Sequence, residues 1–160
     1  MLLMRSASRS GRALPSPRRI LTPLSIWRYR FERRDRKHRS DSRSVNILLV
    51  EDHEDSRVVL SRLLTHCGHE VATAANMQDA LLLLGDLRFD VLVSDIGLPD
   101  GSGLELVTEA KRRQPWKKTV ALTAHARANE KELGLLAGFD EYLTKPFDFH
   151  QLRSLLAETV

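Results

Sequence analysis

The stretch NILLVED, residues 46–52, sets an unbroken apolar run directly before two acidic side chains, and it decides the fold class. Its apolar part, Ile47 to Val50, does not alternate apolar with polar positions. The run VLV at residues 91–93 has the same character. Such runs are typical of strands covered by helices on both faces, which occur almost only in parallel sheets. We therefore predict an α/β domain with a parallel sheet.

The rest of the chain after Val45 supports this prediction, because short apolar runs alternate with longer amphipathic segments. The five predicted strands are Asn46–Val50, Glu70–Ala74, Val91–Ser94, Thr119–Leu122 and Glu141–Leu143. Capping residues and glycines predict helices from Asp55-Ser56 to Gly68, from Asn76 with Asp79 to near Gly85, from Gly103 to Lys111-Arg112-Arg113, through Glu130–Leu136 to Gly138, and from about Asp148 to Glu158.

Length and charge divide the chain into two parts. Its 160 residues suit one ordinary domain. Residues 1–44 carry 13 Lys and Arg against 3 acids, a balance of +10, whereas residues 45–160 carry 12 against 18, a balance of −6. We therefore predict a basic extension over 1–44 and one folded domain over 45–160. The single Cys67 excludes a disulfide scaffold, and no apolar run reaches the roughly 20 residues that span a bilayer, so a cytoplasmic location is expected.

The basic extension has several interpretations. A block of like charge rich in Arg and Ser is expected to be disordered. Contact with nucleic acid or with an anionic membrane is an alternative, because clustered basic side chains attract phosphates of any kind. An organelle transit peptide is disfavoured, since Glu32 and Asp35 interrupt the basic pattern. A true start further downstream would remove the extension altogether.

Reactive side chains follow four of the five predicted strands. Glu51 and Asp52 follow the first strand, Asp95 the third, Thr123 the fourth and Lys145 the fifth. Because all strands of a parallel sheet end at the same edge, these side chains are expected to share one pocket.

The contents of this pocket predict phosphoryl transfer. Clustered carboxylates repel one another, and an oxygen-only ligand set favours magnesium as the cation that relieves the repulsion. Lys145 and Thr123 offer an ammonium and a hydroxyl to the oxygens of a transferred group. Asp95 is then the expected nucleophile, since aspartyl phosphate is a known covalent intermediate.

The motifs ILLVED at 47–52, SDIGLPDG at 94–101, LTA at 122–124 and YLTKPF at 142–147 are similar to those of a known family. With them, residues 45–160 resemble the receiver domain of two-component response regulators over essentially their whole length. The resemblance implies the flavodoxin-like receiver fold, a doubly wound five-stranded parallel sheet with strand order 2-1-3-4-5.

The resemblance also implies a ligand set. Asp95 would be the phosphoacceptor, and the side chains of Asp52 and Asp95 with the Gly97 carbonyl would contact Mg²⁺. Glu51 would act through water, and it stands where many members have aspartate. Gly97 and His125, two positions after Asp95 and Thr123, occupy sites that tune phosphate lifetime in the family.

The resemblance further implies a switch. Thr123 would hydrogen-bond the phosphoryl group and swing inward, Tyr142 would follow as the aromatic switch residue, and Lys145 would bind a phosphoryl oxygen. A cis peptide bond before Pro146 is also implied.

These roles imply a phosphorylation switch that is not a metabolic enzyme. The phosphodonor would be a histidine kinase or histidine phosphotransfer protein that docks beside the active-site loops and the first helix. A downstream protein would read the face formed by the fourth helix, fifth strand and fifth helix. We expect no DNA-binding output domain after Val160, in either a stand-alone receiver or the receiver end of a hybrid kinase.

Three alternatives remain open. A magnesium-dependent aspartyl-phosphate phosphatase of the haloacid dehalogenase kind needs a second acid two residues after its nucleophile, where Asp52 offers only Glu54. A flavodoxin-like nucleotide-binding module needs a glycine-rich or hydroxyl-rich loop after the first strand. A pseudo-receiver adaptor that is never phosphorylated would not need the three acids and Lys145, so their presence argues against this alternative.

Residues outside the pocket are expected to be structural. Asp100 is expected to cap the turn at Gly101. Cys67 is expected to pack near a helix end, and the run Leu81–Leu84 to combine core positions with an exposed apolar edge. Four histidines without metal-ligand spacing are expected at the surface or at helix ends: His53, His66, His69 and His150.

Overall fold

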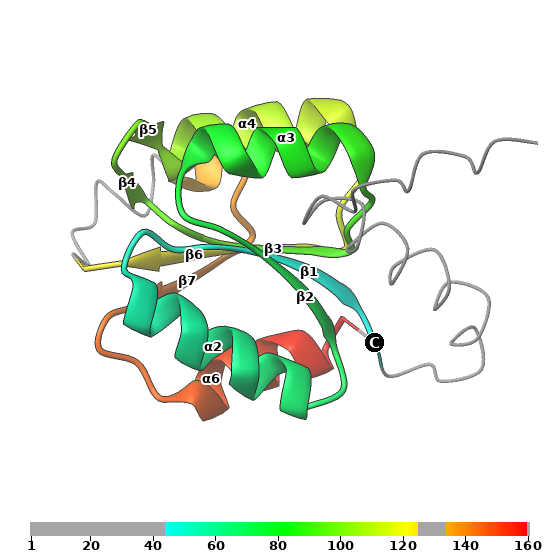
Figure 1. Cartoon of the computed structure of the whole chain (residues 1–160), viewed down its shortest axis with the longest axis vertical. Helices are drawn as coiled ribbons and strands as arrows, with labels where there is room; N and C mark the ends of the chain where they lie inside the picture. The colour runs from blue at the N-terminus through cyan, green and yellow to red at the C-terminus, as the bar shows by residue number, and fades with distance from the viewer. Residues whose placement is uncertain (1–43, 125–133, 160) are drawn as a thin grey trace, which may run out of the picture.

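The computed structural model describes residues 44–124 and 134–159. Its main sheet is parallel and has five strands in the order β2-β1-β3-β6-β7 (Figure 1). The strands are β1 (Asn46–Val50), β2 (Glu70–Ala74), β3 (Val91–Asp95), β6 (Lys118–Thr123) and β7 (Glu141–Thr144). The helices are α2 (Glu54–His66), α3 (Met77–Asp86), α4 (Gly103–Arg113) and α6 (Phe149–Ala157). The predicted fold class and strand order are confirmed.

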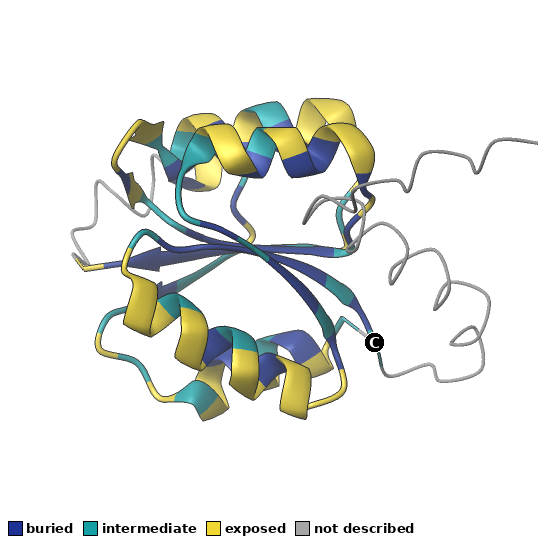
Figure 2. Cartoon of the chain, viewed as in Figure 1, coloured by how far each residue is buried: buried dark blue, intermediate teal, exposed yellow. Residues whose placement is uncertain are grey.

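Helices cover both faces of the sheet. Figure 1 shows α3 and α4 on one face and α2 and α6 on the other. In β1, Leu48 and Val50 pack toward α3 and α4, whereas Ile47 and Leu49 pack toward α2 and α6. Successive side chains of a strand point to opposite faces, so an unbroken apolar run can fill two cores at once. Figure 2 shows the resulting band of buried residues through the sheet.

Two helix boundaries differ from their predictions. Helix α2 begins directly after His53, which offers no side-chain cap, and not at the predicted cap Asp55-Ser56. Gly85 lies inside α3, whose C-cap is Leu87. The predicted start of α3 is correct, because the Asn76 side chain accepts a hydrogen bond from the Asp79 N–H.

A two-stranded hairpin follows β3 that the sequence did not indicate. Its strands are β4 (Gly97–Leu98) and β5 (Gly101–Ser102), and they pair antiparallel. Asp100, in the turn between them, accepts hydrogen bonds of 2.8 Å each from the N–H groups of Met77 and Gln78. Asp100 therefore caps the N-terminus of α3, and its assignment to a local turn was incomplete.

Some predicted features lie outside the described residues. These are the extension up to residue 43, the first part of the helix predicted through Glu130–Leu136, and His125. Residues 134–137 are helical, and Gly138 follows them with a φ of 116°, as a C-terminal glycine should. Among the described helices, none has the length and apolar character to cross a membrane.

Candidate functional site

The predicted site residues gather at the carboxyl edge of the sheet. Glu51 directly follows β1, and Asp95 ends β3 in register with Leu122 of β6. Thr123 is the next residue of β6 and pairs with Thr144 of β7, directly before Lys145. Strand register alone thus brings these segments together.

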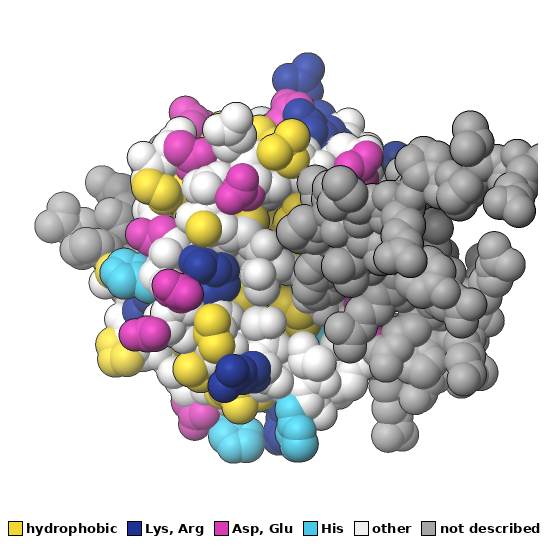
Figure 3. All heavy atoms as spheres, in the orientation of Figure 1, with side chains coloured by type: hydrophobic (Ala, Val, Ile, Leu, Met, Phe, Trp, Pro, Cys, Tyr) yellow, Lys and Arg dark blue, Asp and Glu magenta, His cyan; other side chains and the backbone are white. Residues whose placement is uncertain are grey.

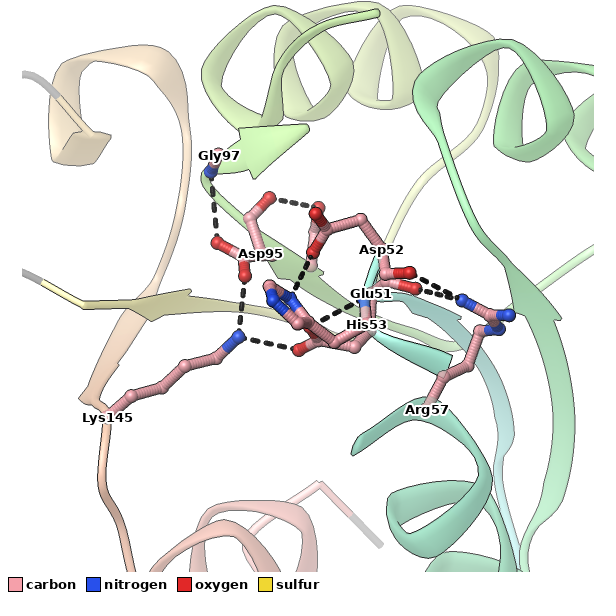
Figure 4. Close-up of polar contacts among 8 residues, drawn as sticks. Glu51, Asp52, His53, Arg57, Asp95, Gly97 and Lys145 are labelled. Atoms are coloured by element: carbon pink, nitrogen blue, oxygen red, sulfur yellow. Dashed lines mark hydrogen bonds and ion pairs between the residues drawn. The ribbon is translucent and has the colours of Figure 1, made fainter. Parts of the chain in front are cut away.

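Lys145 joins the two carboxylates at the centre of the site. Its Nζ lies 2.5 Å from Oδ2 of Asp95 and 2.7 Å from Oε2 of Glu51 (Figure 4). The Glu51 side chain is fully buried, whereas those of Asp95 and Lys145 are 13% and 27% exposed. One partly exposed ammonium therefore pairs with both a buried carboxylate and the predicted nucleophile.

The Lys145 side chain stays protonated at neutral pH. Partial burial alone would lower its pKa, but hydrogen bonds and charge interactions with Asp95 and Glu51 raise the pKa above its usual 10.5. Lys145 is therefore cationic throughout the neutral pH range. An acceptor oxygen on Asp95 consequently lies beside a permanent positive charge.

The loop after β1 is fixed by a residue that sequence reasoning missed. Arg57, in the first turns of α2, donates from Nη1 to the carbonyl oxygens of Glu51 at 2.7 Å and Asp52 at 3.1 Å. The N–H of Glu51 donates to the carbonyl of Ala74 at the end of β2. Arg57 follows Asp52 by five residues, a spacing that would have indicated it once α2 was placed correctly.

His53 is a second participant that the sequence did not assign to the site. Its Nδ1 lies 2.9 Å from Oδ1 of Asp52 and 3.5 Å from Oε1 of Glu51, on a ring that is 77% exposed. Partial burial alone would raise the pKa of Asp52, but the hydrogen bond and charge of His53 lower it overall. The hydrogen bond to Asp52 in turn raises the pKa of His53. His53 is exposed and lies at a helix end, as expected, but its contact with the acids was not predicted, and its position directly after two acids was the available signal.

Asp95 is oriented from its other side by the hairpin. The N–H of Gly97 donates to Oδ1 of Asp95 at 3.0 Å, so the two carboxylate oxygens have different partners (Figure 4). The backbone is close here: a Cβ on Gly103 would stand 2.3 Å from the Asp95 carbonyl oxygen. The metal-ligand role of the Gly97 carbonyl stays a prediction.

The donor set fits a hard divalent cation. Potential ligand atoms of Glu51, Asp52 and His53 lie within 4.8 Å of one another. Asp52 is 32% exposed, so its carboxylate can reach an ion that keeps several waters, as magnesium does. The roles of Asp52 and Asp95 as magnesium ligands stay predictions.

The two predicted switch residues lie on the neighbouring strands β6 and β7. Thr123 is buried, and its carbonyl accepts a 2.7 Å hydrogen bond from the N–H of Lys145. Tyr142 lies on β7 with its ring edge-on to Phe139, at a centroid distance of 6.0 Å. The peptide bond before Pro146 is cis, as the resemblance implied.

Two residues outside the pocket lie at the C-terminal end of α2, as expected, but differ in burial. His69, whose N–H donates to the Leu64 carbonyl, is buried at 7% exposure, and its Nδ1 accepts a hydrogen bond from the N–H of Val45 at 3.4 Å. Cys67 is the C-cap residue of α2 and is exposed. In the run Leu81–Leu84 the expectation holds, since Leu83 and Leu84 are buried and Leu82 is 59% exposed.

Curated proteins with similar sequences are regulators and sensors. The chain is 36% identical over 108 residues to the transcriptional regulatory protein TcrA of Mycobacterium tuberculosis, covering 68% of this chain and 43% of TcrA. It is 32% identical over 114 residues to the sensor protein EvgS of Escherichia coli, covering 71% of this chain and 10% of EvgS. The matched region thus spans less than half of these relatives.

The similar solved structures are also response regulators. The chemotaxis response regulator CheY4 of Vibrio cholerae superposes with a TM-score of 0.67 at 29% identity, over 73% of this chain and 99% of CheY4. The response regulator TrrA of Thermotoga maritima, in complex with Mg(2+)-BeF, superposes with a TM-score of 0.64 at 31% identity, over 72% of this chain and 98% of TrrA.

A family model provides the most direct assignment. The model of the response regulator receiver domain matches residues 47–157, which is most of the chain and all of the described sheet except its first residue. Sheet order, convergent acids and the lysine at the end of β7 agree with that match. The chain therefore belongs to the family of response regulator receiver domains.

Proposed function

We propose that this chain is a phosphoacceptor switch in which Asp95 takes a phosphoryl group from a histidine-phosphorylated protein, with Mg²⁺ bound beside it. The observation that carries the proposal is the position of Lys145, whose ammonium lies between Asp95 and the buried Glu51. An ammonium at this position can pair with a phosphoryl oxygen once Asp95 has become an acyl phosphate.

The proposed step is a transfer between two proteins. An oxygen of the Asp95 carboxylate forms a bond to phosphorus while the nitrogen–phosphorus bond of a phosphohistidine breaks. The leaving imidazole nitrogen keeps the electron pair of that bond and takes up a proton from solvent. Bound magnesium would supply positive charge to the phosphoryl oxygens and to the carboxylates around them.

The residues of the chain supply positioning and charge. The Gly97 N–H holds one oxygen of Asp95, which leaves the orientation of the carboxylate fixed before reaction. Lys145 is expected to follow the negative charge onto the phosphoryl group. Thr123 is expected to donate its hydroxyl to the same group, and Tyr142 to respond to that movement.

The donor is proposed to dock over α2. Val58, Val59 and Leu63 on this helix are 39%, 54% and 38% exposed. Figure 3 shows hydrophobic side chains at the surface on the α2 side of the molecule, interspersed with charged ones. An apolar surface on the helix that follows the acidic loop suits a helical partner that must bring its phosphohistidine to Asp95.

Output is proposed to be a protein contact on the face formed by residues 134–137, β7 and α6. The relatives include both a transcriptional regulator and a sensor, so the chain is proposed to act either by itself or as the receiver end of a hybrid kinase. We further propose that the chain catalyses only its own phosphorylation and dephosphorylation, and that it works in the cytoplasm.

The test is chemical phosphorylation of the full chain. Wild type, Asp95→Asn and Asp52→Asn are incubated with acetyl phosphate and Mg²⁺, and intact mass is measured. We expect one phosphoryl adduct on wild type, none on Asp95→Asn, and an adduct on Asp52→Asn only at higher Mg²⁺. An adduct on Asp95→Asn would move the site, and no adduct on any protein would favour the adaptor alternative.

A further inference from the structure

The side chain of Tyr142 is half-buried, with its hydroxyl at the buried end. Its hydroxyl oxygen is buried and has no hydrogen-bond partner in the part of the chain that the structure describes. A buried hydroxyl without a partner is unfavourable, typically by about 1–3 kcal/mol. Packing must therefore hold the ring in this place, and Phe139 supplies one contact with its ring edge-on at 71°.

The space that receives the hydroxyl lies at Gly134. This glycine is buried and starts the described helical residues 134–137. A Cβ built on Gly134 would stand 1.1 Å from Oη and 2.3 Å from Cζ of Tyr142. These distances are far inside van der Waals contact, and the overlapping atoms belong to a rigid ring. The ring therefore occupies the volume in which any other residue at 134 would carry its side chain.

Gly85, inside helix α3, has no such role. A Cβ on Gly85 of α3 would meet nothing within 4 Å. Replacing glycine by alanine within a helix is ordinarily favourable, by up to about 1 kcal/mol. Gly134 thus forgoes a gain in helix stability at the one place where the ring needs room.

We propose that Gly134 is a positioning residue that keeps open the buried seat of Tyr142, and that it thereby sets the balance between the buried and outward orientations of this ring. A side chain at 134 shifts the balance outward, where the phenol regains water. The link from this balance to phosphorylation rests on the proposed function, but the effect on the ring does not.

The first experiment observes the ring in the unmodified full chain. Protein labelled with 3-fluorotyrosine is studied by fluorine NMR, and Tyr29→Phe in every sample leaves Tyr142 as the only tyrosine. The measured quantity is the change in the Tyr142 shift between H₂O and D₂O, which reports exposure of the ring. Burial also raises the pKa of Tyr142, which agrees with a shielded phenol in wild type.

We expect a small solvent isotope shift for wild type and for the control Gly85→Ala, and a large one for Gly134→Ala. The control matters because it makes the same substitution within a helix where the added methyl group is free. A folded Gly134→Ala protein with the wild-type isotope shift would overturn the proposal.

The second experiment measures the coupling to the phosphoryl site. Beryllofluoride with Mg²⁺ mimics the phosphoryl group, and its affinity is compared for wild type, Gly134→Ala, Tyr142→Ala and the double variant. If the buried ring accompanies the phosphorylated state, Gly134→Ala weakens binding by at least about 5-fold, the lower end of typical coupling. In the Tyr142→Ala background the same change should have no effect, because the ring it displaces is gone.

The outcomes distinguish the role of Gly134 from the proposed function. A wild type that binds no beryllofluoride contradicts the proposed function, while the fluorine shifts still decide the role of Gly134. Equal affinity for wild type and Gly134→Ala, with the ring expelled, contradicts the coupling and limits the role of Gly134 to the ring itself. An equal loss of affinity in the Tyr142→Ala background means that the methyl group acts on the helix and not on the ring, which overturns the proposal.

Discussion

Replacing Lys145 with methionine tests whether the site is held together by charge. The change keeps an unbranched apolar side chain of similar length and removes the ammonium that joins Asp95 to Glu51. Those contacts measure 2.5 and 2.7 Å, and one partner is completely buried. Two like charges would then face each other at the end of the sheet with their shared counter-ion gone.

The expected loss of unfolding free energy in Lys145→Met lies near the lower end of the range for a buried ion pair. Removing one partner of a buried pair typically costs about 3–5 kcal/mol, whereas an exposed pair is worth under about 1 kcal/mol. The Lys145 side chain keeps 27% exposure, so solvent screens part of the interaction. We therefore expect a loss of about 3 kcal/mol in unfolding free energy, or about 12 °C in melting temperature for a domain of this size.

Urea denaturation followed by tryptophan fluorescence measures this loss. The denaturant slope should be unchanged, because the variant buries the same surface. Lys117→Met is the matched control: its ammonium lies 3.5 Å from Asp90 and its side chain is 54% exposed, so the expected loss is under about 1 kcal/mol. If Lys145→Met costs no more than this control, the ion pair does not hold the site.

The pH dependence of this contribution has a definite sign. The folded-state pKa of Lys145 lies above its usual 10.5, so folding favours the protonated amine. The stabilisation is fully present below pH 10.5 and is lost as the pH rises through the folded-state pKa. The difference between wild type and Lys145→Met should therefore persist across neutral pH and shrink in strong alkali.

Three further predictions concern the frame around the site. Burial lowers the pKa of His69 below 6.5, so wild type should lose stability as the pH falls through 6.5, and His69→Gln should remove that part of the slope in urea titrations. Gly103→Ala forces a methyl group against the Asp95 carbonyl, so it should lower the unfolding free energy by about 2–3 kcal/mol and abolish the phosphoryl uptake measured by intact mass. The control Gly85→Ala should lose no stability. Asp100→Ala removes the acceptor for the N–H groups of Met77 and Gln78 but leaves the Asn76 cap of α3, and should cost about 1 kcal/mol by thermal unfolding.

The strands could be predicted from the sequence because their signal is local. Unbroken apolar runs mark the central strands, and the predicted β1 and β2 agree with the structure residue for residue. The start of α2 could not be read in the same way. Ser56 is a better capping residue than His53, but Arg57 binds the loop carbonyls and fixes the first turn further upstream. A side-chain contact with the preceding loop thus outweighs the capping preference of Ser56.

Two of the unpredicted contacts join residues that lie far apart along the chain. Asp100 caps a helix that begins 23 residues earlier, and His69 accepts from a residue 24 positions away. Neither partner is close enough in the sequence to form a local pattern. The sequence therefore indicated a turn for Asp100 and the surface or a helix end for His69, without these long-range hydrogen bonds.

The pairing of charges at the site shows what strand order adds to a motif. The sequence places Glu51 beside Asp52, which suggests that these two acids share a cation. Their main partners differ in the structure: Glu51 is buried against Lys145, 94 residues away, and also lies 3.5 Å from His53, whereas Asp52 faces His53 near solvent. Lys145 reaches both Glu51 and Asp95 because β3 lies between β1 and β6 in the sheet. Glu51 is therefore a buried partner of the lysine, whereas Asp52 is accessible to solvent, and substitutions at Glu51 and Asp52 should not have equivalent effects.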